Sequence, residues 1–337
     1  MFLHDSHGRR ITDLRISVTD RCNYRCVYCR AGNNGAQYAE LPIADYLRMA
    51  RLLAALGVEK IRLTGGEPLL RSGLLDLIRE LAQLKTLSGA PLDLAITTNG
   101  HLLAEMAEPL QRAGLNRATV SMDAVDPAEF ARITRVANGY DAVLAGVRAA
   151  RRAGLAPVKV NCVLLRGFND DQVLPFARFA AAEGVVVRFI EFMPLEEDRV
   201  WSPEIVVPLE EILATLGTEF EVTELDHAGA ETARRYSLRP LTTDNSQLTT
   251  AEVGIIAPVS HPFCGHCSRV RITSDGKLRT CLFSQSDHDL IGRMRAGASD
   301  AELTDYIRRV VDQKEARHHI GEPGFQPPSR TMVHIGG

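Results

Sequence analysis

Residues 13–29 read DLRISVTDRCNYRCVYC, and this stretch decides the fold. Its first part, Asp13–Val18, is a short run with β-branched residues and predicts a strand. A polar loop then leaves the strand and carries three cysteines in a C-x3-C-x2-C spacing. In parallel β/α folds the reactive face lies at the carboxyl ends of the strands, so we expect a functional loop here. The cysteines are Cys22, Cys26 and Cys29.

The same strand-and-helix rhythm continues along the chain. Short β-branched runs alternate with amphipathic stretches, and repeated strand–helix units imply a parallel sheet. Further strands are expected at Lys60–Leu63, Asp93–Thr97, Arg117–Ser121, Val158–Leu164 and Val185–Glu191. Helices are expected near residues 42–56, 69–84, 102–113, 140–153, 171–182 and 208–216.

Polar motifs follow nearly every predicted strand, and they bear on whether the units form a doubly wound sheet or a partial barrel. The motifs are TGGEP (64–68), TTNG (97–100), SMD (121–123) and EFM (191–193). Chemically useful side chains thus gather at the carboxyl ends of the strands. The sequence therefore favours an α/β fold that is a partial, open, six-unit, TIM-like β/α barrel.

The rhythm changes near residue 217. Residues 218–260 predict strands without intervening helices, and a second group of cysteines follows. We therefore expect a barrel over residues 1–217 and a smaller C-terminal region over residues 218–337 that covers the open side of the barrel. The tail GEPGFQPPSRTMVHIGG (321–337) is rich in Pro and Gly and is expected to lack regular structure.

The composition is that of a globular protein without a nucleic-acid or membrane role. The 337 residues are 45% hydrophobic and 24% charged, and 39 basic against 42 acidic residues give a net charge of −3. This balance argues against a nucleic-acid coat or a membrane-surface protein. No apolar run approaches the length of a membrane span, and the N-terminus lacks the apolar core of a signal peptide. A cytoplasmic location is expected.

The seven cysteines form a pattern typical of a metal or cluster site in a reducing compartment. Six of them make two triplets far apart in the sequence, and Cys162, among apolar neighbours, is expected to be a core thiol. An odd count without a secretion signal does not indicate a disulfide framework. Three thiolates on a [4Fe–4S] cluster leave one iron open for a small molecule, whereas a zinc loop is the plainer alternative for the first triplet.

The second triplet lies in FCGHCSRVRITSDGKLRTCLF (263–283) and consists of Cys264, Cys267 and Cys281. A zinc knuckle completed by His261 or His266 is one interpretation. A site for an anionic ligand is the other interpretation. Arg269 and Arg271 favour it, because they lie on one face of a predicted strand beside two of these cysteines. Guanidinium groups at this spacing suit phosphate or carboxylate oxygens. Lys277 and Arg279 are expected to be solvated charges.

The cysteine loop with Tyr28 before its last cysteine, together with TGGEP, resembles the radical S-adenosylmethionine (SAM) superfamily. Within it, the resemblance narrows to the GTP 3′,8-cyclase family and runs from about residue 8 to the last glycine. The motifs that carry it are DLRISVTDRCNYRCVYC, KIRLTGGEPLLR, TTNG, VKVN, RFIEFMP, FCGHCSRVRITSDGKLRTCLF and the terminal IGG. The loop RAGNNGAQYAEL after the first triplet departs from the family's usual pattern, which leaves its local shape open.

The resemblance implies two [4Fe–4S] clusters, one on each triplet, with the first binding SAM and the second meeting the guanine base of GTP. The implied SAM contacts are Tyr28, Gly66, Ser121 and Met193. The implied GTP contacts are Arg15, Arg62, Thr97, Lys159, Arg269, Val270 and Arg271. The tail residues Gly336 and Gly337 are implied to reach the active site, and His318 and His319 are left without a role.

The resemblance also implies an activity and partners. A 5′-deoxyadenosyl radical would remove H3′ of GTP, and C3′ would join C8 to give (8S)-3′,8-cyclo-7,8-dihydroguanosine 5′-triphosphate, the first step of molybdenum cofactor biosynthesis. The partners would be a flavodoxin-like electron donor and, in the pathway, cyclic pyranopterin monophosphate synthase. The chain would be a monomer or a homodimer.

Two alternatives from other classes stay open at this point. One is a different radical SAM enzyme with an auxiliary cluster, such as a peptide-modifying maturase, although those carry more than three cysteines in their C-terminal region. The other is a non-enzymatic zinc-binding or electron-carrying module. Iron and acid-labile sulfide would exclude zinc, and GTP binding would then separate the cyclase from the maturase.

Overall fold

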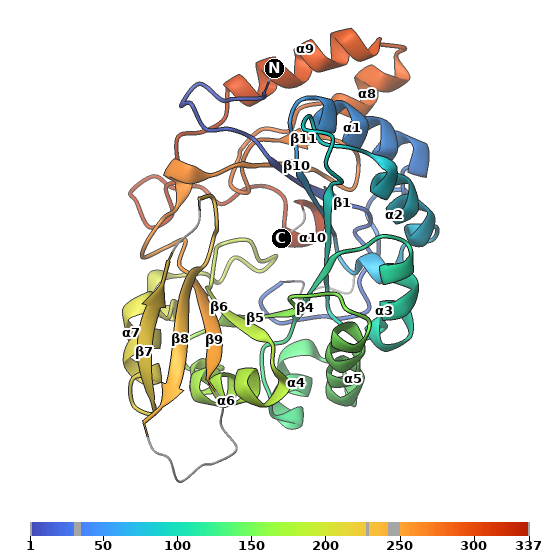
Figure 1. Cartoon of the computed structure of the whole chain (residues 1–337). Helices are drawn as coiled ribbons and strands as arrows, with labels where there is room; N and C mark the ends of the chain where they lie inside the picture. Colours follow the sequence, from blue (N-terminus) through green and yellow to red (C-terminus); the bar gives the residue numbers. More distant parts are fainter. Residues whose placement is uncertain (1, 30–34, 227–228, 242–249, 336–337) are drawn as a thin grey trace.

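A computed structural model describes residues 2–29, 35–226, 229–241 and 250–335. Its first six strands are parallel neighbours in sequence order, and each agrees with the predicted strand to within one residue at either end. The partial β/α barrel is confirmed, because these strands curve around a common centre with helices outside (Figure 1). The strands are β1 (Asp13–Ser17), β2 (Lys60–Thr64), β3 (Asp93–Thr98), β4 (Arg117–Ser121), β5 (Lys159–Leu164) and β6 (Val186–Glu191).

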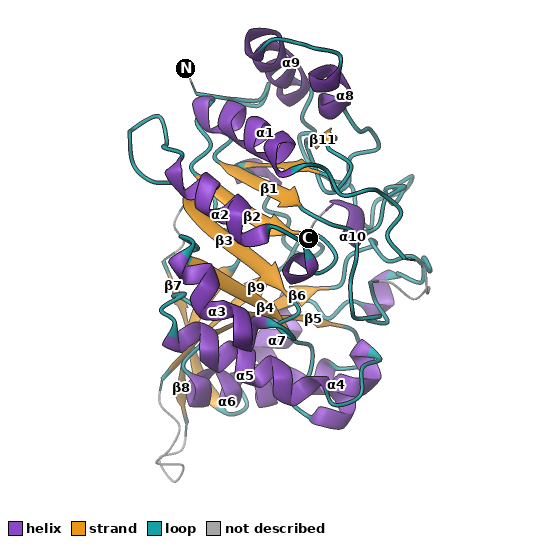
Figure 2. Ribbon diagram, turned by 90° about the vertical axis from the view of Figure 1, so that its right-hand side faces the viewer, coloured by secondary structure: helices purple, strands orange, loops and turns teal. Residues whose placement is uncertain are grey.

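The helices lie on the outer side of the strands, as Figure 2 shows from the side. The second helix begins at Leu74 and not at the predicted residue 69. Residues Pro68–Leu70 form a separate 3-10 turn, and Gly73 adopts a left-handed conformation just before the helix. The sequence analysis missed the helix Pro127–Thr134, which Asp126 caps by accepting bonds from two backbone N–H groups. The helices are α1 (Ile43–Ala55), α2 (Leu74–Gln83), α3 (Leu103–Arg112), α4 (Pro127–Thr134), α5 (Gly139–Arg152), α6 (Val173–Glu183) and α7 (Leu209–Leu216).

Alternation along the strands separates the core from the barrel interior. Leu14 and Ile16 of β1 are fully buried in the hydrophobic core, whereas Arg15 between them lines a cavity inside the barrel. Successive side chains of a strand point to opposite faces, so an apolar layer under the helices leaves the other face for polar residues. The lumen therefore holds the site.

The C-terminal region extends the sheet at both of its edges rather than only covering its open side. At one edge, β9 pairs with β6. At the other edge, β10 pairs with β1 and lies parallel to it. The sheet order is β11-β10-β1-β2-β3-β4-β5-β6-β9-β8-β7, and it is not closed. The division at residues 217 and 218 stays a prediction. These strands are β7 (Phe220–Leu225), β8 (Arg234–Pro240), β9 (Ala251–Ile256), β10 (Arg269–Ile272) and β11 (Leu278–Arg279).

Three helices close the chain: α8 (Leu290–Arg295), α9 (Asp300–Asp312) and α10 (Met332–Ile335). A capping box of Ser299 and Glu302 begins α9, which the sequence analysis did not predict. The expectation of a tail without regular structure was wrong for α10, whose short turn lies at the mouth of the barrel, beyond the strand ends (Figures 1 and 2).

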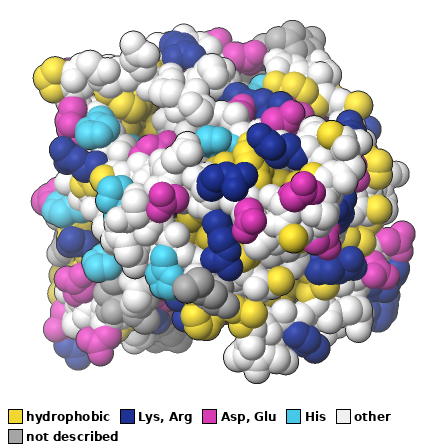
Figure 3. Space-filling model, turned by 90° about the horizontal axis from the view of Figure 1, so that it is seen from above, with side chains coloured by type: hydrophobic (Ala, Val, Ile, Leu, Met, Phe, Trp, Pro, Cys, Tyr) yellow, Lys and Arg dark blue, Asp and Glu magenta, His cyan; other side chains and the backbone are white. Residues whose placement is uncertain are grey.

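Basic and acidic side chains are interspersed on the outer surface seen from above, on the side where α9 lies (Figure 3). Among the described residues, none of the helices has both the length and the apolar character needed to span a bilayer.

Candidate functional site

One cavity of about 550 Å³ inside the barrel gathers most of the residues singled out from the sequence. Both cysteine triplets line it, as do all four predicted SAM contacts and every predicted GTP contact except one. The exception is Val270, whose side chain is fully buried in the core because it points to the opposite face of β10 from Arg269 and Arg271. Gly336 and Gly337 lie outside the described residues.

The first thiol set, Cys22, Cys26 and Cys29, lies in the loop that leaves β1. The backbone N–H groups of Arg25 and Val27 donate to carbonyl oxygens at the end of α4, at 3.1 and 3.0 Å. Burial raises the pKa values of Cys22 and Cys26. The thiols are therefore held in a low-dielectric loop where a neutral thiol is favoured unless a positive centre binds the thiolate.

The TGGEP turn after β2 presses directly against the first cysteine loop. A Cβ atom at Gly65 would stand 2.2 Å from the carbonyl oxygen of Thr19, and one at Gly66 would stand 2.3 Å from that of Arg21. The Gly66 and Glu67 N–H groups donate to the same two oxygens at 2.9 and 2.7 Å. The glycines are required because two backbones meet here, and the amide of Gly66 is used to fix the cysteine loop.

Glu67, which the sequence analysis left without a role, ties this turn to the end of β3. Its fully buried carboxylate accepts hydrogen bonds from Thr98 Oγ1 at 2.7 Å, from the N–H of Asn99 at 2.6 Å and from that of Leu69 at 2.9 Å. Burial raises the pKa of Glu67 to about 7 against the effect of these bonds. The signal was present in the TGGEP motif itself, but only its glycine had been assigned.

Tyr28 and Asp123 join the first cysteine loop to the end of β4. Tyr28 Oη donates to Asp123 Oδ2 at 2.6 Å, and the N–H of Val163 donates to Asp123 Oδ1 at 2.8 Å. Burial raises the pKa of Asp123 to about 6. The SMD motif had suggested Ser121 alone, but its aspartate is the residue that fixes the predicted SAM contact Tyr28.

Positive charge concentrates in the lumen. Burial lowers the pKa of Arg15 well below its usual value, and Arg271, Arg269 and Arg62 lower it further. Arg15 Nε is buried and has no hydrogen-bond partner among the described residues. Like charges and an unpaired donor in a buried place are costly unless an anion occupies the space between them.

Two further lumen cations lie on β5 and β6. Burial, followed by Arg188, lowers the pKa of Lys159 to about 8, and burial, followed by Arg62, lowers the pKa of Arg188 to about 9. Arg188 Nε donates to Asn161 Oδ1 at 2.9 Å, which holds it in the cavity. The sequence analysis missed Arg188, although the quoted motif RFIEFMP begins with it.

Arg62 illustrates how these cations are oriented. Its Nη1 donates to Thr97 Oγ1 and to Thr119 Oγ1, at 3.1 Å in each case, so hydroxyl groups on β3 and β4 hold it. The predicted GTP contact Thr97 thus has a partner among the predicted cations. A polyanion with several acceptor oxygens suits a cluster of this kind.

The second thiol set, Cys264, Cys267 and Cys281, faces the lumen from the β10–β11 region. Burial acts to raise the pKa of Cys267, but Arg269 and Lys314 outweigh it and lower this pKa to about 6. The surroundings therefore favour a thiolate.

The zinc-knuckle interpretation finds no support in His261. Its Nε2 lies 3.3 Å from Glu210 Oε1 instead.

Cys162, the lone cysteine, is fully buried in β5, as predicted.

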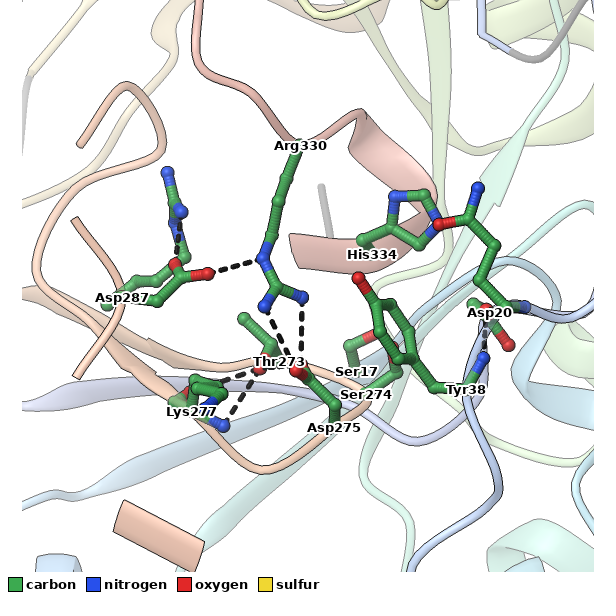
Figure 4. A network of polar contacts seen from close by, with 12 residues as sticks. Ser17, Asp20, Tyr38, Thr273, Ser274, Asp275, Lys277, Asp287, Arg330 and His334 are labelled. Carbon is green, nitrogen blue, oxygen red and sulfur yellow. Dashed lines mark hydrogen bonds and ion pairs between the residues drawn. The ribbon is translucent and has the colours of Figure 1, made fainter. Parts of the chain in front are cut away.

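The C-terminal segment is fastened beside the cavity by a polar network (Figure 4). Arg330 donates to both carboxylate oxygens of Asp275 at 2.8 and 2.9 Å and pairs with Asp287. The N–H of Ser274 donates to the carbonyl oxygen of His334 at 3.2 Å. Met332, in the helix α10 that follows Arg330, lines the cavity. The network thus brings the end of the described chain to the barrel mouth.

The donor sets fit iron–sulfur chemistry. Each set offers three cysteine thiols to one cavity. Thiolates are ligands that favour iron–sulfur clusters, zinc or copper(I). Within the described ranges, no three His, Cys, Asp or Glu side chains are grouped to hold a single metal ion. A [4Fe–4S] cluster needs a wider arrangement, since its thiolates bind different iron atoms.

Comparisons with known proteins place both halves of the chain in related families. Residues 16–180 match the model of the radical SAM superfamily, and residues 185–320 match that of Molybdenum Cofactor Synthesis C. The chain is 42% identical to the GTP 3′,8-cyclase of Rhodopirellula baltica over 99% of this chain and 92% of that protein. It is 40% identical to the enzyme of the same name from Moorella thermoacetica over 99% and 100%.

Solved structures show the same fold at low sequence identity. Streptococcus suis SuiB bound to S-adenosylmethionine aligns with a TM-score of 0.61 at 15% identity, over 90% of this chain and 69% of that one. SuiB bound to the precursor peptide SuiA aligns with a TM-score of 0.62 at 14% identity, over 90% and 68%.

Proposed function

The chain belongs to the GTP 3′,8-cyclase family of radical SAM enzymes, and from this premise we propose how its residues carry out the family's reaction. The protein is a lyase that converts GTP to (8S)-3′,8-cyclo-7,8-dihydroguanosine 5′-triphosphate, the first step of molybdenum cofactor biosynthesis. It uses SAM and [4Fe–4S] clusters. The observation that carries the proposal is one cavity lined by two sets of three thiols and by a cluster of arginines.

Cys22, Cys26 and Cys29 hold the first cluster. When bound, it would supply the electron that cleaves SAM to methionine and a 5′-deoxyadenosyl radical able to take H3′ of GTP, and formation of the C3′–C8 bond would need one further electron and a proton. The chain's own residues have to bind, orient and enclose the two small molecules. Contacts to SAM come from Tyr28, Gly66, Ser121 and Met193, which line the cavity at the carboxyl ends of their strands or in the loops beyond.

Two buried carboxylates position these contacts. Glu67 fixes the TGGEP turn to β3, and Asp123 fixes Tyr28 to β4. Both are bonded to groups on a neighbouring strand end, so the SAM contacts are held relative to one another before SAM arrives. Such preorganisation aligns the reacting carbon of SAM with its target.

The second thiol set, Cys264, Cys267 and Cys281, holds the other cluster and anchors the guanine base. The triphosphate is bound by Arg15, Arg62, Thr97, Lys159, Arg188, Arg269 and Arg271. Val270 contributes only its backbone, because its side chain lies in the core. A base fixed at one end and phosphates fixed at the other leave the ribose little freedom, which directs C3′ toward SAM.

The C-terminal segment completes the enclosure. Arg330 holds the described end of the chain beside the cavity, and Met332 of α10 lines that cavity. Gly336 and Gly337, which follow in the sequence, contribute to the reaction. The electron donor is a flavodoxin-like protein, and cyclic pyranopterin monophosphate synthase takes the product onward. The protein acts in the cytoplasm as a monomer or homodimer, with its division into a barrel and a C-terminal region at residues 217 and 218.

Deuterium transfer tests the proposal. Anaerobically reconstituted protein is incubated with SAM, a strong reductant and GTP deuterated at C3′, and the 5′-deoxyadenosine is analysed by mass spectrometry. We expect deuterium in it. Unlabelled 5′-deoxyadenosine would overturn the substrate assignment and favour the peptide-modifying maturase. Alanine at Cys22, Cys26 or Cys29 is the matched control and abolishes SAM cleavage.

A further inference from the structure

The segment Lys314–Ala316, directly after α9, packs against the second thiol set, although the sequence motifs do not include it. Lys314 is 3% exposed and lines the cavity. Its Nζ donates a hydrogen bond to the carbonyl oxygen of Thr280, the residue before Cys281. Thr280 Oγ1 in turn donates to Glu315 Oε2 at 2.8 Å. The segment therefore holds the turn that presents Cys281 from two directions.

Arg9, from the N-terminal segment, ties the same stretch to the other end of the thiol set. Its Nη1 donates to the carbonyl oxygen of Cys264 at 2.9 Å and to that of Ala316 at 2.8 Å, while Nη2 donates to the carbonyl oxygen of Glu315 at 2.6 Å. Asp5 orients the guanidinium by accepting a bond from Nε at 2.6 Å. One buried fork thus links the first ligand to the segment that supports the last one.

Lys314 lines the same cavity as Cys264, Cys267 and Cys281, and its Nζ bonds to the residue that precedes Cys281. Burial acts to raise the pKa values of Cys267 and Cys281, whereas the charge of Lys314 acts to lower both, and Glu315 acts to raise that of Cys281. An ammonium with little solvent contact is costly unless negative charge lies nearby. Ligand thiolates supply that charge.

We propose that Lys314 is a positioning residue for the cluster on the second thiol set, where its buried charge offsets that of the thiolates and its bond to Thr280 fixes the Cys281 turn. Arg9 performs the same fixing at Cys264. This role rests on the proposed function, because it requires that the second set binds a [4Fe–4S] cluster. Reduction adds negative charge to a cluster, so a neighbouring cation favours the reduced form and raises the reduction potential.

The test measures the second cluster by itself. Full-length protein with Cys22, Cys26 and Cys29 replaced by alanine, called here the triple-alanine background, retains only the second set. In this background Lys314→Met keeps the length of the side chain and removes its charge, whereas Lys314→Arg keeps the charge. Lys277→Met is the matched control, since Lys277 lies on the β10–β11 hairpin that leads to Cys281 but pairs with the exposed Asp289 at 3.3 Å. Iron and sulfide are counted, and an anaerobic redox titration followed by electron paramagnetic resonance gives the midpoint potential.

We expect about four iron atoms per chain in the background. Lys314→Met shifts the midpoint potential to a more negative value, while Lys314→Arg and Lys277→Met leave it unchanged. Full iron with an unchanged potential in Lys314→Met would overturn the charge role. If Lys314→Met does not fold, Lys314→Arg still decides, because a potential or iron count different from the background contradicts the proposal. A background that binds no iron would instead remove the second cluster from the proposed function, and this role with it.

The role of Arg9 is tested by the rate at which the second cluster loses iron to a chelator. Arg9→Lys in the same background keeps a positive charge but loses the fork that reaches three carbonyl oxygens. We expect iron to be released to a chelator several-fold faster than from the background. Arg10→Lys is the control, because Arg10 pairs with Glu59 at the surface. Equal release rates in the two variants would show that Arg9 does not hold the Cys264 turn.

Discussion

Arg15 of β1 and Arg271 of β10 stand directly opposite each other in the register of two parallel strands. Both side chains line the cavity, and each belongs to a strand whose other face is packed in the core. The pairing brings like charges together at the point where the two ends of the chain meet. It makes sense only as a site for an anion, and it implies a conflict between stability and binding.

Replacing one of these charges therefore stabilises the protein that lacks GTP. We expect Arg15→Met to raise the free energy of unfolding by roughly 1 kcal/mol, since a half-buried cation among like charges, with its buried Nε unbonded, becomes an apolar side chain of similar length. GTP affinity falls about tenfold or more, because a charge-assisted hydrogen bond is lost. Anaerobic thermal unfolding and calorimetry measure the two quantities. Arg10→Met is the surface control, and a destabilised Arg15→Met that binds GTP normally would contradict the interpretation.

Lys159 gives GTP binding a dependence on pH. Burial and Arg188 depress its pKa to about 8 in the folded protein, so the charged form proposed to bind phosphate is lost above that pH. GTP affinity should fall as the pH rises through about 8. The free energy of unfolding should rise over the same pH range. The unfolded chain keeps the Lys159 proton to a higher pH than the folded chain, and below about pH 8 the buried charge opposes folding.

The control for this prediction keeps a charge at the same position. Lys159→Arg should bind GTP with little change over pH 7.5 to 9, whereas Lys159→Met should bind weakly and without the fall. Binding is measured by calorimetry at each pH. The groups that face Lys159 are Arg188, Arg117, Arg62 and Glu231. A fall of the same size in Lys159→Met would assign the titration to one of them.

The bond between Tyr28 and Asp123 should act as a unit. Tyr28→Phe and Asp123→Asn each weaken SAM binding, and the double variant should be little worse than either single variant. A coupling energy of about 1.5 to 3 kcal/mol is expected for a buried hydrogen bond to a carboxylate. Equilibrium binding of SAM to reconstituted protein gives the cycle. Additive effects would mean that Asp123 acts independently of Tyr28.

Arg330 should matter through the tail that it fastens. Arg330→Met is expected to lower cyclisation more than SAM cleavage, so the ratio of cyclic product to 5′-deoxyadenosine falls. If Arg330 acts through Gly336 and Gly337, its replacement adds nothing in a chain from which these two residues are deleted. Arg148→Met removes a comparable ion pair with Glu183 on the outer surface and is the control. An additive loss in the double variant would separate Arg330 from the tail.

The barrel strands were predictable because each of them is a short β-branched run followed by a polar motif, and both features are local in the sequence. Both cysteine triplets and most of the lumen cations were found through motifs. Val270 shows the limit of that approach: a motif covers consecutive residues, but a strand turns only alternate ones toward the cavity. Motif position alone therefore included one residue too many.

Residues that act through distant contacts were missed. Glu67 and Asp123 were inside quoted motifs, but their roles depend on bonds to the next strand that no local pattern reveals. Arg9 and Lys314 reach the second thiol set from opposite ends of the chain. Only tertiary structure brings them together, and a buried lysine after a helix has the same sequence signature as an exposed one.

The position of β10 beside β1 has a consequence for the way the protein is made. Synthesis runs from the N-terminus, so β1 and its cysteines emerge long before Arg269–Ile272, the strand that pairs with them. Until then β1 has an open edge, and the growing chain lacks the second thiols and two of the arginines proposed to bind phosphate. A chain released early from the ribosome cannot enclose a radical. The arrangement of the strands thus reserves the reaction for molecules that have been translated beyond Cys281.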